Sequence, residues 1–106
     1  MSPQYKIFTT DEFNHRFSKL DRQLQEQIRK EIDQLGDNPY AGKPLGYTFF
    51  REKKIQNYRF YYLIYDEFVV VFVITMSTKK DQQNAINKIK YLIPYYREEI
   101  KKKAQL

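Results

Sequence analysis

The sequence predicts an α+β fold, a twisted antiparallel β-sheet with an N-terminal helical hairpin and a C-terminal helix packed against it. Apolar residues recur every three or four positions between residues 13 and 35, which is the period of amphipathic helices. Three consecutive segments rich in β-branched and aromatic residues follow residue 46. Because the 106 residues contain neither an internal repeat nor a linker, we expect one domain over residues 1–106.

The N-terminal part is expected to form one strand and two helices. Residues 4–8 alternate in polarity, as a short strand does, and Thr9, Thr10 or Asp11 can cap the helix that follows. A polar break at residues 19–21 divides the apolar series into two helices that pack as an antiparallel hairpin. Gly36 ends the second helix, and the Pro and Gly content of residues 37–46 predicts a loop. The apolar series consists of Phe13, Phe17, Leu20, Leu24, Ile28, Ile32 and Leu35.

Three strands are predicted next, over residues 47–55, 58–65 and 68–76. Gln56-Asn57 forms the first turn and Asp66-Glu67 the second. The third strand is apolar on both faces, which is typical of a central strand covered on both sides. Residues 85–92 return to helical spacing, Pro94 is expected to interrupt the helix, and residues 95–106 form a weaker terminal helix. We therefore expect a core over residues 1–93 and a C-terminal basic helix over residues 94–106.

Composition excludes several kinds of site. The chain has no cysteine, so a disulfide, a thiolate metal site and a Cys nucleophile are impossible. The single histidine, His15, excludes a His-rich metal site, and beside Phe13 and Phe17 it fits a surface or boundary position better than a catalytic one. We therefore expect neither a metal nor another cofactor. The longest apolar run, residues 68–74, is too short to span a bilayer, so we expect no membrane association and a cytoplasmic location.

The net charge of +6 is concentrated near the C-terminus. Residues 79–106 carry eight Lys or Arg against three Asp or Glu, whereas residues 1–46 carry seven of each. This asymmetry favours a polyanion or an acidic protein as partner on one side of the molecule. A lysine-rich tail that only keeps the protein soluble explains the charge of Lys101, Lys102 and Lys103 equally well.

Basic residues on the strands are the candidate chemical groups. Alternation places Arg51 and Lys53 on one face, and we expect Arg59 of the next strand and Lys79 to lie close to them. Crowded cations bind phosphate and shift one another's pKa, so that a lysine can act as acid or base. Gatekeeping of an edge strand against aggregation is the plainer explanation for Arg51 and Lys53.

The two faces of the second strand are expected to differ. Tyr58, Phe60, Tyr62 and Ile64 are assigned to the core. The alternate face, with Arg59, Tyr61, Leu63 and Tyr65, is the candidate for a concave nucleic-acid surface.

The order of these features resembles the RelE/ParE superfamily of toxins from toxin–antitoxin systems. The helical hairpin is followed by NPYAGKPLG, a basic strand, NYRFYYLIYDE, VVVFVIT and a Lys-Lys pair, and the similarity covers about residues 5–90. The Tyr-Arg dipeptide that opens a strand, with an acidic turn and a Val-rich strand behind it, is its most specific part. The resemblance implies the same α+β fold and a toxin as the function.

RNA-cleaving members of the superfamily imply a role for each basic residue. They cut mRNA, usually in the ribosomal decoding site, by activating the 2′-hydroxyl without a metal. By position, Arg59 would contact the scissile phosphate, and Arg51 with Lys53 or Lys54 would match the paired basic residues of the preceding strand. Lys79 or Lys80 would match the basic residue after the central strand. The implied partners are mRNA, the ribosome and an acidic antitoxin.

One departure from the pattern leaves other functions open. Cleaving members often carry an aromatic residue or histidine a few positions after that basic residue, where this chain has residues 81–86 without any aromatic. Tyr91, Tyr95 or Tyr96 are candidates to replace it in contacting RNA. The alternatives are a DNA gyrase inhibitor without nuclease activity, from the ParE branch, and a non-catalytic RNA-binding module.

Overall fold

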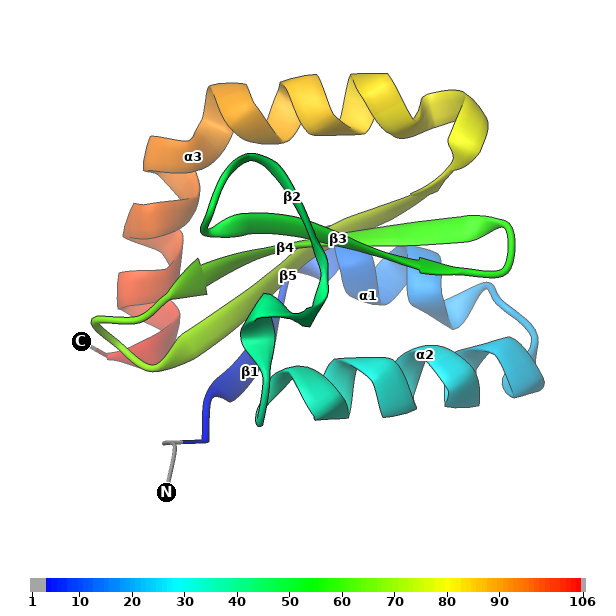
Figure 1. Ribbon diagram of the computed structural model, residues 1–106, viewed down its shortest axis with the longest axis horizontal. Helices are drawn as coiled ribbons and strands as arrows, with labels where there is room; N and C mark the ends of the chain where they lie inside the picture. The colour runs from blue at the N-terminus through cyan, green and yellow to red at the C-terminus, as the bar shows by residue number, and fades with distance from the viewer. Residues whose placement is uncertain (1–3, 106) are drawn as a thin grey trace.

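The computed structural model describes residues 4–105 as three layers, with a five-stranded sheet between one long helix and a pair of shorter helices (Figure 1). The elements in chain order are β1 Lys6–Thr9, α1 Asp11–Ser18, α2 Arg22–Leu35, η1 Pro39–Ala41, β2 Lys43–Tyr47, β3 Phe50–Ile55, β4 Tyr58–Tyr65, β5 Val70–Thr78, η2 Lys79–Asp81 and α3 Gln82–Ala104. The predicted α+β class is therefore confirmed.

The strands lie in the order β1-β5-β4-β3-β2. β1 pairs with β5 in parallel, whereas the other neighbouring strands are antiparallel, so the sheet is mixed and not purely antiparallel as expected. β1 is joined through α1 and α2 to the antiparallel meander of β2, β3, β4 and β5, since a parallel pair needs a crossover connection longer than a hairpin turn. β5 is an interior strand between β1 and β4, covered on both faces as its apolar sequence predicted, and Val70 to Ser77 are all buried.

The helical hairpin covers one face of the sheet. The Thr10 hydroxyl accepts from the Phe13 N–H at 2.9 Å, and an Asp21 carboxylate oxygen accepts from the Leu24 N–H at 2.9 Å, so each helix begins with a side-chain cap. The apolar stripe of α2, which includes the fully buried Ile28, packs on Phe60, Tyr62 and other residues of the same sheet face.

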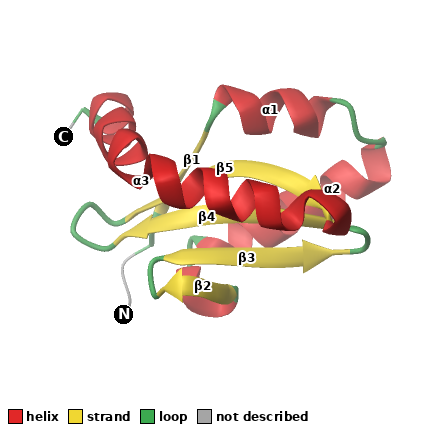
Figure 2. Ribbon diagram, turned by 90° about the horizontal axis from the view of Figure 1, so that it is seen from above, coloured by secondary structure: helices red, strands yellow, loops and turns green. Residues whose placement is uncertain are grey.

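The opposite face of the sheet is covered by α3, as Figure 2 shows. Ile86, Ile89, Tyr96 and Ile100 of α3 are buried against this face. The helix continues through Pro94, where we expected an interruption, and it changes direction between its orange and red parts in Figure 1. A proline removes one backbone N–H donor and clashes with the preceding turn, which bends a helix without ending it when both halves are packed. The core on this face therefore extends beyond residue 93.

Two connections differ from the sequence prediction. Residues 43–46, expected to be loop, form together with Tyr47 the edge strand β2, and a short turn separates β2 from β3, which begins at Phe50 and not at residue 47 as expected. The turn between β4 and β5 spans residues 66–69, with N–H donation from Phe68 to Tyr65 and from Val69 to Asp66, and is longer than the predicted Asp66-Glu67. None of the helices within residues 4–105 has the length and apolar character of a membrane-spanning helix.

Candidate functional site

The register of the β3–β4 hairpin determines which charged residues meet. Gln56-Asn57 forms a two-residue turn, so Ile55 pairs with Tyr58 and Lys54 pairs with Arg59. Arg59 is in turn the partner of Ser77 on β5. Directly paired residues of an antiparallel sheet point to the same face. Lys54, Arg59 and Ser77 therefore form one row across the face that α3 covers.

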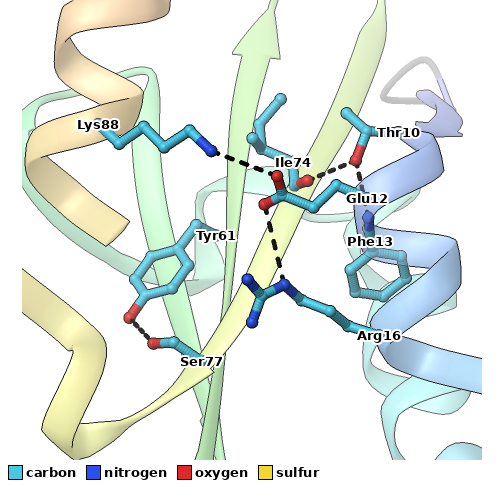
Figure 3. A network of polar contacts seen from close by, with 8 residues as sticks. All are labelled: Thr10, Glu12, Phe13, Arg16, Tyr61, Ile74, Ser77 and Lys88. Carbon is cyan, nitrogen blue, oxygen red and sulfur yellow. Dashed lines mark hydrogen bonds and ion pairs between the residues drawn. The ribbon is translucent and has the colours of Figure 1, made fainter. Parts of the chain in front are cut away.

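A bulge in β5 places Ser77 on this face. Tyr61 pairs with Thr75 but Tyr62 pairs with Val73, so Ile74 is an extra residue in β5. An extra residue shifts the alternation of a strand by one position, so Thr75 and Ser77 point toward α3. The Tyr61 hydroxyl and Ser77 Oγ lie 2.7 Å apart, and Figure 3 shows this contact between β4 and β5. This contact holds the Ser77 side chain in place beside Arg59, its partner on β4.

Four cations surround a pocket of about 300 Å³ at the end of this row. We call it the Arg59 pocket; its lining consists of Lys54, Gln56, Asn57, Arg59, Thr78, Lys79 and Lys80. Arg59 is only 9% exposed. Within residues 4–105, none of the four cations forms an ion pair, although six ion pairs occur elsewhere. Four positive charges around one pocket favour the binding of an anion.

Two cations of a neighbouring groove are paired with a carboxylate. In the groove between α1 and α3, Glu12 lies 3.4 Å from Lys88 Nζ and 3.9 Å from Arg16 Nε (Figure 3). This groove has a volume of about 340 Å³ and includes Tyr96 in its lining. Arg16 and Lys88 thus share one carboxylate, whereas none of the four cations of the Arg59 pocket forms an ion pair within residues 4–105.

Arg51 and Lys53 share a face, as predicted, but it is the opposite face from Arg59. The Arg51 guanidinium donates to the carbonyl oxygens of Thr48, Tyr40 and Gly42 at 2.8, 3.0 and 2.7 Å. Lys53 Nζ lies 3.4 Å from Glu31 of α2. The expected convergence of Arg51 and Lys53 with Arg59 was therefore wrong, because the odd and even positions of β3 point to different sides of the sheet. Lys54, the alternative to Lys53 in the match to the superfamily, is the lysine that faces Arg59.

The expected nucleic-acid surface on β4 is also wrong. Tyr61 and Leu63 have no exposed surface and Tyr65 is 7% exposed, because α3 covers them. Burial raises the pKa of the Tyr61 hydroxyl, so it remains a protonated donor. The predicted core residues Tyr58, Phe60, Tyr62 and Ile64 do pack in the core with the helical hairpin. β4 is covered on both faces.

Tyr91 and Tyr95 lie on the outer side of α3, with exposed fractions of 84% and 59%. They are one helical turn apart and open to solvent. They do not line the Arg59 pocket. Tyr96, the third tyrosine considered, is buried against Phe72.

Glu52 is a residue of this face that the sequence analysis missed. It pairs with Tyr61, two positions from Lys54, and is 7% exposed. Its carboxylate oxygens accept from Gln82 Nε2 at 3.1 and 2.9 Å. The two-residue turn carried the signal, since it places positions 52 and 54 on the face of Arg59 and positions 51 and 53 on the other.

Comparison with known proteins agrees with this architecture. Residues 7–82 match the family model described as the ParE toxin of the type II toxin–antitoxin system parDE. The chain belongs to the ParE toxin family. The family match includes every cation of the Arg59 pocket, and it ends at the first residue of α3, so Tyr91 and Tyr95 lie outside it. No curated protein sequence matches the chain.

Solved structures place this ParE family member beside RelE toxins. The RelBE toxin–antitoxin complex of E. coli matches with 28% identity and a TM-score of 0.63, covering 70% of this chain and 95% of that one. A double mutant of the E. coli toxin RelE in the free state matches with 25% identity and a TM-score of 0.68, covering 80% and 92%. A toxin–antitoxin complex from Mycobacterium tuberculosis, at 21% identity and a TM-score of 0.64 over 72% and 99%, shows the shared fold.

Proposed function

We propose that this toxin is an mRNA endoribonuclease that works without a metal ion and cuts mRNA on the ribosome. One observation carries the proposal, namely that the Arg59 pocket gathers four cations without an ion-pair partner within residues 4–105. RNA phosphates are the anions that such a pocket suits, and clustered cations can stabilise the charge that develops as a phosphodiester is cleaved. The similarity to RelE toxins also supports a function on mRNA.

In the proposed reaction, Arg59 contacts the scissile phosphate. Arginine stays protonated, and its planar fork donates to two phosphate oxygens at once. Lys54 adds positive charge from the neighbouring strand. Lys79 or Lys80 supplies the proton that the leaving 5′-oxygen takes up. Tyr91 and Tyr95 offer exposed rings on which RNA bases can stack outside the pocket.

We propose an acidic antitoxin as the protein partner. The E. coli RelE relative is found in a complex with an antitoxin. This chain carries eight basic against three acidic residues over 79–106, which favours a partner of opposite charge. The complex should form rapidly at low salt, and its association rate should fall steeply as salt is raised.

In-vitro translation followed by toeprinting tests the nuclease proposal. Wild-type protein should produce cuts in the mRNA at defined positions within codons, and Arg59→Ala should abolish them. Loss of one phosphate-clamping group from a pre-organised site is expected to lower cleavage about 10²–10³-fold. Translation that stops without any mRNA cut would rule out the nuclease.

Inhibition of DNA gyrase is the second candidate, and two observations favour it. The matched family model is that of ParE toxins. The first turn of α3 carries Gln82, Gln83 and Asn84, with no aromatic side chain after the lysine pair. A supercoiling assay with purified gyrase distinguishes the candidates, because only a gyrase inhibitor lowers supercoiling while leaving mRNA intact. An RNA-binding module without activity would bind mRNA and affect neither assay.

A further inference from the structure

The groove between α1 and α3 gathers carboxylates that the proposed nuclease does not use. Two pockets, of about 340 and 440 Å³, share Glu12, Lys88 and Tyr96 in their linings, and we call the two together the α1–α3 groove. The larger part is lined by three carboxylates, those of Asp11, Glu12 and Glu99, and by one cation, that of Lys88. On a chain with a net charge of +6, this is a local excess of negative charge. Such an excess favours a cation as ligand.

Two of the three carboxylates have no cationic partner in the chain. Glu12 is shared by Lys88 Nζ and Arg16 Nε, as Figure 3 shows. Neither Asp11 nor Glu99 forms an ion pair within residues 4–105. Asp11 is exposed and Glu99 is half-buried, so both are accessible to a ligand. The Lys88 contact shows that one carboxylate of this groove already binds an alkylammonium group.

The Tyr96 hydroxyl lies in the groove without a partner. Tyr96 is only 7% exposed and lines both pockets of the groove. Burial, followed by the charges of Glu12 and Glu99, raises the pKa of Tyr96 to about 12, which places the hydroxyl near both carboxylates. No hydrogen bond within residues 4–105 engages this hydroxyl. A buried hydroxyl that lacks a partner costs free energy, so a ligand that donates to its oxygen is favoured.

The rest of the groove suits an alkyl chain better than a peptide. Ile74 and Leu92 give the larger pocket an apolar surface, and the Tyr95 ring, 59% exposed, offers a face to a cation. A peptide that adds to a sheet needs free backbone groups at the edge strand. The Ile74 carbonyl of β5 already accepts from the Thr10 hydroxyl. Methylene segments need no such groups.

We propose that the α1–α3 groove binds a linear polyamine. One ammonium group of the ligand binds Glu99 and donates to the Tyr96 hydroxyl, and the methylene segment packs on Leu92. A second ammonium group binds Glu12, where it competes with Lys88. The groove shares no residue with the lining of the Arg59 pocket, so this site does not depend on nuclease activity.

Equilibrium dialysis of spermidine against the full chain, free of nucleic acid and at low salt, tests the proposal. Glu99→Gln should weaken binding about 5–30-fold, because it removes a charged acceptor. Tyr96→Phe keeps the ring and should weaken binding about 3–10-fold. Glu98→Gln is the matched control, since it removes the same charge from the adjacent residue, which pairs with Lys101 and does not line the groove. It should bind spermidine like wild type.

Lys88→Gln separates ligand binding from a structural role. This substitution frees Glu12 from its internal ammonium group and should tighten spermidine binding about 3–10-fold. Weaker binding by Lys88→Gln would show that the Lys88 contact only supports the structure and would contradict the proposal. If Tyr96→Phe does not fold by circular dichroism, Glu99→Gln, at a half-buried position, decides alone.

Three other results would overturn the polyamine site. Absence of saturable spermidine binding below about 10 mM would exclude it. Equal losses for Glu98→Gln and Glu99→Gln would show that only the net charge of the protein matters. Tighter binding of N-acetylarginine amide than of spermidine would assign the groove to a basic side chain of a protein partner.

Discussion

Lys54 faces Arg59 across the β3–β4 hairpin on the side of the sheet that α3 covers. Lys53, the preceding residue, lies on the other side and contacts Glu31 of α2. Two adjacent lysines therefore have different surroundings, one unpaired beside a pocket and one in an ion pair. The relationship separates the charges that can bind a ligand from those that stabilise the fold.

Arg51 is expected to stabilise the fold and not to bind RNA. Its guanidinium donates to three backbone carbonyl groups and lies 5.0 Å from the centre of the Tyr40 ring. Arg51→Ala should lower the free energy of unfolding by about 1–3 kcal/mol, because these carbonyl groups lose their charged donor. Urea unfolding followed by circular dichroism measures the change, with Lys53→Ala as control. Loss of RNA binding at unchanged stability would contradict this role.

Much of the fold follows from periodicity. The helical stripe between Phe13 and Leu35, the three consecutive strands and the interior position of β5 all depend on local spacing, which a sequence displays directly. β2 was missed because residues 43–47 contain Pro44 and Gly46, which are typical of loops, and the strand exists only through its pairing with β3. The path of α3 through Pro94 likewise depends on tertiary packing of Tyr96 and Ile100.

The candidate site was predicted in part. Arg59, Lys54, Lys79 and Lys80 do gather around one pocket, whereas Arg51 and Lys53 do not join them. The predicted turn already implied this result, because a two-residue hairpin pairs position 54 with 59. The burial of Tyr61 was not accessible from local pattern, since it requires knowing that α3 packs on that face. The same holds for Ser77, whose direction depends on the β5 bulge.

The second half of α3 is expected to be part of the core. Ile100 has no exposed surface and packs with the residues between α3 and the sheet. Ile100→Ala should lower the free energy of unfolding by about 2–5 kcal/mol, because it leaves a cavity. Lys103→Ala, at an exposed position of the same helix, should change it by less than about 0.5 kcal/mol. Thermal unfolding of both variants checks the difference, and equal stability would show that residues 94–106 are dispensable.

Asp66 is expected to make stability depend on pH in the acid range. The hydroxyls of Tyr40 and Tyr5 donate to its carboxylate, the latter at 2.6 Å, and these bonds lower the pKa of Asp66. A pKa below the unfolded value of about 3.9 means that the stabilisation is complete above about pH 4 and is lost as the pH falls through the folded-state pKa. The difference in stability between wild type and Asp66→Asn should therefore be constant near neutral pH and shrink in acid. If the stability difference between wild type and Asp66→Asn did not change with pH, this role of Asp66 would be contradicted.

Separate substitution of two neighbouring lysines tests most directly whether the Arg59 pocket binds the RNA phosphate. Lys54→Gln and Lys53→Gln remove the same charge from adjacent residues on opposite faces of β3. Toeprinting of translated mRNA at equal protein concentration should show at least about 10-fold less cleavage for Lys54→Gln and wild-type cleavage for Lys53→Gln. Equal effects of the two substitutions, or a larger effect of Lys53→Gln, would contradict a phosphate site at the Arg59 pocket.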